Sequence, residues 1–244
     1  GMNIAEGNMI EGDPRKPIHD CHFRVEGPVV SHLMHTFAYE WNFTTGEVLE
    51  GDDWFPDIES VGNIVARGLP AGPDMGLNPI RWTLLGALAE ARSNVRIVTP
   101  YFIPDSTLRT NISLAAMRGV IVDIVLPQTN NLPFCDWAST PILAWLARAG
   151  CRIWKTSGPF NHSKMMTVDG MWAMVGSANW DDRSLRLNFE FNLECYGSEF
   201  AGELDDLIER KISTARPLTY EELAGRPLPL RIRDSFFRLA SPYL

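Results

Sequence analysis

Apolar and polar positions follow two alternating patterns along most of the chain from about residue 79 onward. Apolar residues spaced three and four apart predict helices, and short β-branched runs predict buried strands. The predicted helices cover 79–93, 105–117, 141–149 and 200–214, and the predicted strands cover 95–98, 120–126, 152–156 and a run from 189. Strands that alternate with helices indicate an α/β layered domain, with a central mixed sheet flanked by helices.

The first 60 residues do not follow this alternation. Residues 28–41 have a helical pattern, and the rest of the segment is rich in turn formers. Residues 68–79 contain three Pro and three Gly, a composition typical of a connection between two structural units. We therefore expect two parts, a fragment over 1–60 and a domain over 61–244.

A β-hairpin is predicted around Asp169-Gly170, because Asp-Gly between two apolar runs is a strong two-residue turn signal. The predicted pairs, counted outward from the turn, are Val168 with Met171, Lys164 with Val175, and His162 with Ser177. Opposed residues share a face of the sheet, and side chains alternate with a period of two. Four polar side chains are therefore expected on one face: His162, Lys164, Ser177 and Asn179.

An imidazole, an ammonium, a hydroxyl and a carboxamide on one patch suit a phosphodiester, whose charged oxygens need hydrogen-bond donors and a cation. An imidazole can also attack phosphorus and form a covalent phospho-enzyme, which requires no metal. Its second ring nitrogen then needs an acceptor. Glu190 lies on a strand predicted to neighbour the hairpin and is the expected acceptor for His162.

The spacing of these residues resembles the HxK(x)4D(x)6GSxN signature of the phospholipase D superfamily, with every signature position present. Further stretches, over 99–105, over 188–194 and from 217 onward, resemble the C-terminal half of bacterial cardiolipin synthases. The resemblance covers most of residues 60–244. It implies a phospholipase D-like fold and a phosphatidyltransferase that exchanges phosphatidyl groups between phosphatidylglycerol molecules through a phosphohistidine, with no cofactor and no metal.

Carried over position by position, the resemblance gives each signature residue a role. His162 is implied to be the nucleophile or its partner acid, and Glu190 to orient it. Lys164, Ser177 and Asn179 are implied to hold the substrate phosphate. Asp169, although part of the catalytic signature, is expected to be a structural carboxylate at the turn.

Family members bring two such motifs together across an internal pseudo-twofold axis, whereas this sequence contains one His-x-Lys. Its opening resembles the tail of a first copy, with Asn3 equivalent to Asn179, so we expect an open reading frame that extends upstream through another His-x-Lys. Either an upstream half of the same protein or a homodimer would complete the site. The alternatives are a phospholipase D-type phosphodiesterase or nuclease, and an inactive half or membrane-binding scaffold.

The charge balance bears on these alternatives. Twenty-two Lys and Arg against 30 Asp and Glu give a net charge of −8, which disfavours nucleic acid as a partner. The four cysteines are widely spaced and lie in apolar or strand contexts, which favours buried free thiols in a reducing compartment. No apolar run is long enough to span a bilayer. We therefore expect a peripheral protein on the reducing side of the bacterial cytoplasmic membrane, acting on phosphatidylglycerol.

Two further segments each allow two interpretations. His19, His22, His32 and His35, with Asp20 and Cys21 between them, resemble a metal cluster, but their spacing matches no standard zinc pattern, which favours the rim of the active site or plain surface. Near the C-terminus, Arg231, Arg233 and Arg238 alternate with Ile232, Phe236, Phe237 and Leu239. That pattern predicts either a helix packed on the body or an interfacial membrane anchor.

Overall fold

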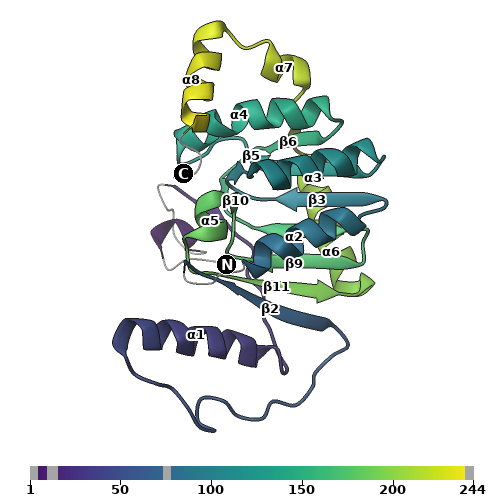
Figure 1. Ribbon diagram of the computed structural model, residues 1–244. Coiled ribbons are helices and arrows are strands. Elements are labelled where there is room, and N and C mark those ends of the chain that lie inside the picture. Colours follow the sequence, from purple (N-terminus) through teal and green to yellow (C-terminus); the bar gives the residue numbers. More distant parts are fainter. Residues whose placement is uncertain (1–4, 10–15, 74–77, 240–244) are drawn as a thin grey trace.

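The computed structural model describes residues 5–9, 16–73 and 78–239, and an eight-stranded mixed sheet runs through them (Figure 1). The strand order is β12-β6-β5-β3-β8-β9-β11-β2. In chain order the strands are β2 (Val65–Ala71), β3 (Asn94–Val98), β5 (Ile121–Pro127), β6 (Arg152–Thr156), β8 (Met165–Val168), β9 (Trp172–Gly176), β11 (Glu190–Tyr196) and β12 (Arg216–Pro217). Strands β3, β5 and β6 are parallel, and the remaining neighbours pair antiparallel.

Helices cover both faces of this sheet. One face is covered by α2 (Pro79–Glu90), α3 (Ser106–Met117) and α4 (Pro133–Arg148), and the other by α6 (Ser198–Ser213). Side chains alternate between the two cores, so that Val95 and Ile97 of β3 pack under α2 and α3 while Val98 packs toward α6. The predicted α/β layered fold with a central mixed sheet is confirmed.

Helices also stand at the two ends of the strand order. Helix α1 (Val30–Thr45) contacts the edge strand β2, and α8 (Leu228–Leu239) packs on α4 beyond the opposite edge. The short helices are η1 (Glu6–Asn8), α5 (Asp182–Arg186) and α7 (Tyr220–Ala224). Two small parallel pairs lie outside the main sheet: β1 (Ile18–His19) with β7 (Phe160–Asn161), and β4 (Phe102–Ile103) with β10 (Trp180–Asp181).

Two predicted boundaries were wrong. The fourth helix begins at Pro133 rather than at Pro141, because a proline is favoured in the first turn, where its missing N–H leaves no donor unpaired. Part of the expected connection over 68–79 is the edge strand β2, which pairs Pro70 with Phe191. An edge strand tolerates proline, since one side of it has no neighbour to receive an N–H.

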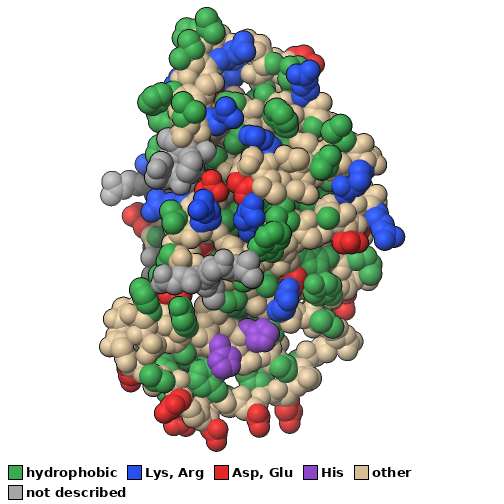
Figure 2. All heavy atoms as spheres, in the orientation of Figure 1, with side chains coloured by type: hydrophobic (Ala, Val, Ile, Leu, Met, Phe, Trp, Pro, Cys, Tyr) green, Lys and Arg blue, Asp and Glu red, His purple; other side chains and the backbone are tan. Residues whose placement is uncertain are grey.

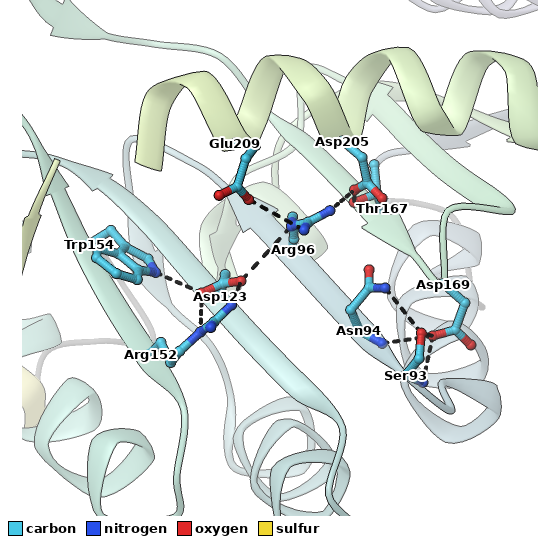
Figure 3. A network of polar contacts seen from close by, with 10 residues as sticks. All are labelled: Ser93, Asn94, Arg96, Asp123, Arg152, Trp154, Thr167, Asp169, Asp205 and Glu209. Carbon is cyan, nitrogen blue, oxygen red and sulfur yellow. Dashed lines mark hydrogen bonds and ion pairs between the residues drawn. The ribbon is translucent and has the colours of Figure 1, made fainter. Parts of the chain in front are cut away.

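A buried polar network ties the α6 face of the sheet together (Figure 3). Asp123 of β5 is fully buried. Its carboxylate accepts hydrogen bonds from the Nε and Nη2 atoms of Arg152, and from the Trp154 indole at 2.7 Å. Arg96 of β3 connects this carboxylate to α6, with its Nη1 atom 2.8 Å from Asp205. The network joins three parallel strands to the helix that covers them.

The cysteines are free, and Cys135, Cys151 and Cys195 are buried, as predicted, while Cys21 is half-buried. Burial raises the pKa of the Cys135 and Cys151 thiols to about 12 and that of Cys195 to about 11, which keeps all three protonated. These side chains act as small apolar core residues.

Candidate active site

The motif hairpin forms, but the predicted register was wrong by one residue. Asp169 and Gly170 both adopt positive φ, at 54° and 62°, and the Met171 N–H bonds to the Val168 carbonyl at 3.0 Å. Met171 is then an extra residue, so that Val168 pairs with Trp172 and Met165 with Val175. The expected pairs of His162 with Ser177 and of Lys164 with Val175 are therefore not formed.

His162 is held at the start of the hairpin by the N-terminal segment. Its backbone N–H bonds to the His19 carbonyl at 2.7 Å, immediately beyond the β1–β7 pair. Its Nδ1 atom lies 3.2 Å from Oδ2 of Asp20, the residue that follows β1. The Asp20 side chain is almost completely buried, whereas that of His162 is 21% exposed. The imidazole is thus fixed on one side and open on the other.

Lys164 lies directly against this imidazole, so the two motif side chains share a face, as the sequence predicts. The Lys164 Nζ atom is 2.9 Å from Nδ1 and 3.0 Å from Nε2 of His162, and it donates to the His162 carbonyl at 2.6 Å. Lys164 is buried, and this burial lowers its pKa to about 8. The negative charges of Asp20, Glu190 and Asp181 oppose that shift, so three carboxylates surround the ammonium.

Two aromatic rings and a buried acid complete the surroundings. Tyr101 presents its ring edge to the imidazole at a centroid distance of 6.3 Å, and Phe160 lies at 5.8 Å. Asp181 accepts the Ser184 N–H at 2.7 Å and caps α5, and burial raises the pKa of its carboxyl to about 6. Sequence reasoning missed Asp181 and Tyr101, which carry no motif of their own.

The carboxylate that contacts His162 is that of Asp20, and not that of Glu190 as predicted. Within the described residues, Glu190 is hydrogen-bonded to the Asn188 amide at 3.1 Å and has no hydrogen bond to the imidazole. Glu190 begins β11, which is separated from β8 by β9, whereas β1 lies beside β7 and places Asp20 next to the ring. The position of Asp20 therefore agrees with the interpretation that the stretch from His19 to His22 forms the rim of the active site.

Ser177 and Asn179 form their hydrogen bonds with residues other than His162 and Lys164. The Ser177 hydroxyl accepts the Phe191 N–H at 3.0 Å, and the Asn179 amide donates to the Ser184 hydroxyl at 3.1 Å. The Asn179 side-chain oxygen is buried and has no hydrogen-bond partner among the described residues. That both residues hold phosphate stays a prediction.

Asp169 lies at the opposite end of β8 from His162 and has a structural position. Its carboxylate accepts the backbone N–H groups of Arg92, Ser93 and Asn94 at 2.8–2.9 Å, as well as the Ser93 hydroxyl. These hydrogen bonds outweigh the effect of burial and lower the pKa of Asp169. The residue fixes the turn to the loop between α2 and β3, as expected of a structural carboxylate.

Two of the other histidines, His32 and His35, make their contacts elsewhere. His32 Nδ1 accepts the Gly68 N–H at 3.0 Å, and His35 stacks on Phe55 at a centroid distance of 4.5 Å. Across the ranges that the structure describes, no three His, Cys, Asp or Glu side chains are grouped as metal ligands would be. The equivalence of Asn3 to Asn179 concerns a residue outside the described ranges.

Together, the mixed sheet and the His162–Lys164 pair define a phospholipase D-like domain. Residues 84–212 match the family model described as "Cardiolipin synthase, PLD-like domain". The chain belongs to this family. In the part of it that the structure describes, no helix is long and apolar enough to cross a membrane.

Curated relatives agree with the family model. The chain is 34% identical over 246 residues to "Cardiolipin synthase 2" of Staphylococcus epidermidis, a match that covers all of this chain and 50% of the relative. It is 34% identical over 227 residues to "Major cardiolipin synthase ClsA" of Bacillus subtilis, covering 92% of this chain and 47% of the relative. The chain thus spans about half the length of these relatives.

Solved structures share the fold at low sequence identity. Phosphatidylserine synthase of Haemophilus influenzae superposes with a TM-score of 0.62 at 18% identity, over 84% of this chain and 52% of that one. Nuc of Salmonella typhimurium, a phospholipase D family member, gives a TM-score of 0.56 at 19% identity, over 64% of this chain and 99% of that one. At such identities these likenesses concern the fold alone.

Proposed function

We propose that this chain supplies one half of the active site of a phosphatidyltransferase of the cardiolipin synthase type, with phosphatidylglycerol as its substrate. The observation that carries the proposal is the contact triad of Asp20, His162 and Lys164. It combines an oriented imidazole with a buried ammonium in a chain whose relatives are cardiolipin synthases. Transfer, rather than hydrolysis, follows if a second lipid hydroxyl replaces water as the acceptor.

In the first step, Nε2 of His162 attacks the phosphorus of phosphatidylglycerol. The new P–N bond forms as the P–O bond to the glycerol headgroup breaks, and a general acid protonates the departing oxygen. The Asp20 carboxylate accepts a hydrogen bond from the Nδ1–H group, which leaves the Nε2 lone pair for attack and stabilises the positive charge that develops on the ring. The Lys164 ammonium transfers its hydrogen bonds from the ring to the phosphate oxygens.

In the second step, a hydroxyl of another phosphatidylglycerol molecule attacks the phosphohistidine. The acceptor hydroxyl loses its proton to the same acid–base group, the P–N bond breaks, and the imidazole regains its lone pair. The products are cardiolipin and free glycerol, so that atoms and charges balance. Water in the same position would give phosphatidic acid, which is the phospholipase D reaction.

The acid–base group of both steps is a second histidine, which this chain does not supply. We assign it to a second HxK motif, contributed by another half of the same protein or by a second copy of this chain. In line with the expected division of the chain, we assign residues 1–60 to that other half. The contact between Asp20 and His162 then crosses the boundary between the halves.

Helix α1 supports the presence of a covering partner. It has no buried residue, and its exposed side chains include Phe37 and Phe43, which are 48% and 60% exposed. Trp54, in the loop after α1, is 43% exposed. A cluster of exposed aromatic side chains is typical of a protein interface.

The proposal is tested by converting phosphatidylglycerol vesicles with an assembly that contains two HxK motifs, one of them from this chain. We expect cardiolipin and glycerol in equal amounts, and no product when His162 is replaced by Asn. Cleavage of DNA with steep salt dependence and without lipid turnover would contradict the proposal in favour of a nuclease.

A further inference from the structure

Helix α8 is anchored to the body by one side. Asp234 is buried on that side, where its carboxylate forms ion pairs with Arg226 at 2.9 Å and Arg233 at 2.8 Å. The Arg233 guanidinium lies 4.3 Å from the Trp137 ring centroid, and Phe237 packs edge-on against the same ring at 4.9 Å. These contacts fix the rotation of α8 on α4.

The opposite side of α8 is an apolar stripe. We define the stripe by four residues, which are 62–75% exposed: Leu228, Ile232, Phe236 and Leu239. Their spacing of four, four and three residues places them on one line along a helix. Covering a contiguous apolar stripe of this kind is favourable in water, and such stripes are typical of interaction sites.

The charges that flank the stripe are cationic. Arg231 and Arg238 are exposed, whereas the one acid of the helix, Asp234, is buried and paired. Residues 26–60, at the other edge of the sheet, hold eight Asp and Glu and no Lys or Arg. Figure 2 shows this separation, with hydrophobic and basic side chains over α8 at the top and acidic ones around α1 at the bottom.

This charge distribution selects the occupant of the stripe. An anionic surface attracts the α8 end of the molecule and repels the α1 end, and both effects orient the chain in the same way. A helix with an apolar face, flanking arginines and low overall hydrophobicity is typical of one that lies in a bilayer interface. A twofold contact between α8 of two copies would place Arg231 and Arg238 against the same cationic side chains of the other copy, which an anionic bilayer avoids.

Helix α8 also lies at the same end of the sheet as the active site. Its contact residue Trp137 is in the first turn of α4, which follows the carboxyl end of β5. Asn131, just before that helix, accepts a 2.6 Å hydrogen bond from the Tyr101 hydroxyl, and the Tyr101 ring neighbours His162. A membrane bound at α8 therefore lies on the side of the sheet to which the contacts of Trp137, Tyr101 and His162 belong.

A groove between α4, α7 and α8 gives this surface a place for a lipid phosphate. It has a volume of about 280 Å³ and is lined by Arg148 and Arg231, by Trp145 and Tyr220, and by Asp234, whose charge is already paired with two arginines. Trp145 is 59% exposed, and aromatic side chains of this kind favour the headgroup region of a bilayer. Two arginines and two amphipathic rings suit the phosphate and glycerol of an anionic headgroup.

We propose that α8 docks the protein on an anionic phospholipid bilayer, with its apolar stripe at the acyl boundary and Arg231 and Arg238 against lipid phosphates. This inference rests on the proposed function, since it names the surface by which the enzyme reaches its substrate.

Flotation of the 244-residue chain with vesicles tests the stripe. We expect binding to vesicles of equimolar phosphatidylcholine and phosphatidylglycerol, reduced at least about tenfold by Ile232→Glu or Phe236→Glu, because a charge in the stripe is costly at the acyl boundary. Met171→Glu is the matched control: Met171 is 57% exposed and lies at the hairpin turn, and this variant keeps full binding. Circular dichroism checks that all variants are folded.

The arginines are tested by lipid composition. Arg231→Gln and Arg238→Gln each reduce binding to the phosphatidylglycerol vesicles about fivefold, as expected for one charge at an anionic surface, and leave the weaker binding to pure phosphatidylcholine unchanged. The control is Arg24→Gln, a highly exposed arginine at the acidic end of the molecule, which changes neither.

Two outcomes overturn the docking proposal. One is vesicle binding that Phe236→Glu leaves intact, and the other is loss of self-association in that variant in the ultracentrifuge, which would make α8 an interface between copies. Vesicle binding is measured without catalysis, so the flotation result does not depend on whether the protein transfers phosphatidyl groups. Conversely, a two-motif assembly with Phe236→Glu still converts monodisperse short-chain phosphatidylglycerol at the original rate.

Discussion

The imidazole of His162 is hydrogen-bonded to Asp20, a residue 142 positions earlier in the chain, at 3.2 Å between Nδ1 and Oδ2. The parallel pairing of β1 with β7 brings the two residues together. A nucleophilic imidazole needs its second nitrogen held by an acceptor, so this pairing connects the N-terminal segment to catalysis.

Asp20→Asn removes that acceptor's charge while keeping the shape of the side chain. We expect kcat for phosphatidyl transfer to fall by about 10²-fold to 10⁴-fold, with KM little changed, because the ring loses its orientation and the charge that stabilises it. Steady-state kinetics of a two-motif assembly measure this. The control is Asp52→Asn, in the exposed acidic segment. Full activity in Asp20→Asn would contradict the assignment.

Lys164 makes the reaction sensitive to alkali. Its pKa is lowered to about 8 by burial, so the ammonium that we assign to the substrate phosphate is present below that pH and is lost as the pH rises through it. We expect kcat/KM to fall about tenfold per pH unit above pH 8. A rate that stays constant to pH 10 would show that the charge on Lys164 is not required.

Asp181 supplies one of the negative charges that oppose this shift. Asp181→Asn removes that charge and keeps an oxygen that accepts the Ser184 N–H. The alkaline limb of the pH profile, where kcat/KM falls, should therefore move to lower pH. Asp182→Asn, one residue further along the chain, is the matched control and leaves the limb in place. A limb that moves upward in Asp181→Asn would refute the electrostatic account of the site.

Asp169 should matter for stability rather than for chemistry. Asp169→Ala loses the acceptor of three backbone N–H groups and places Ala at φ 54°, so we expect the free energy of unfolding to fall by about 2–4 kcal/mol. Asp169→Asn, which keeps one acceptor oxygen and tolerates the left-handed conformation, should cost less. Urea denaturation at pH 7 distinguishes the two variants.

The pH dependence of that effect has a definite sign. The pKa of Asp169 is lowered in the folded protein, so its contribution is present above the unfolded pKa of 3.8 and is lost as the pH falls through the lower, folded value. The stability difference between wild type and Asp169→Ala should therefore shrink in acid. A difference that grows in acid would contradict this.

Asp123 is the centre of the buried network. Asp123→Ala removes the buried carboxylate and leaves the donors of Arg152 and Trp154 without their acceptor. We expect a loss of about 3–5 kcal/mol in the free energy of unfolding. Glu209→Gln, a 60% exposed acid that touches the same network through Arg96 at 3.4 Å, should change stability by less than about 1 kcal/mol. Equal losses in the two variants would rule out burial as the cause.

The layered fold was predictable because the helical stripes and β-branched runs are local patterns. The hairpin register was not, since all four residues of β8 are buried and both faces of the strand are covered. Without a polar face, alternation does not distinguish one register from the next. Met171 was therefore assigned to a pair, although it is the extra residue that moves every pair by one.

The contact between His162 and Lys164 and the structural position of Asp169 at the turn were predictable, because the motif spacing that places them is local in sequence. The partner carboxylate was not, because Asp20 reaches the imidazole through a pairing between two-residue strands far apart in the chain. Strands that short have no detectable periodicity. Glu190 was chosen because it lay in a clearly alternating strand, but β9 separates that strand from β8.

The central claim is that His162 forms a covalent bond to phosphorus. Rapid alkaline quenching of a two-motif assembly turning over phosphatidylglycerol, followed by mass spectrometry of its peptides, tests this directly. We predict an adduct on the peptide that contains His162, carrying the phosphatidyl group or the glycerophosphoryl group that remains after alkaline loss of its acyl chains; its P–N bond is stable to base and labile to acid, and it is absent in His162→Asn. Steady turnover of wild type with no adduct on His162, or with an adduct that persists in His162→Asn, would contradict the account.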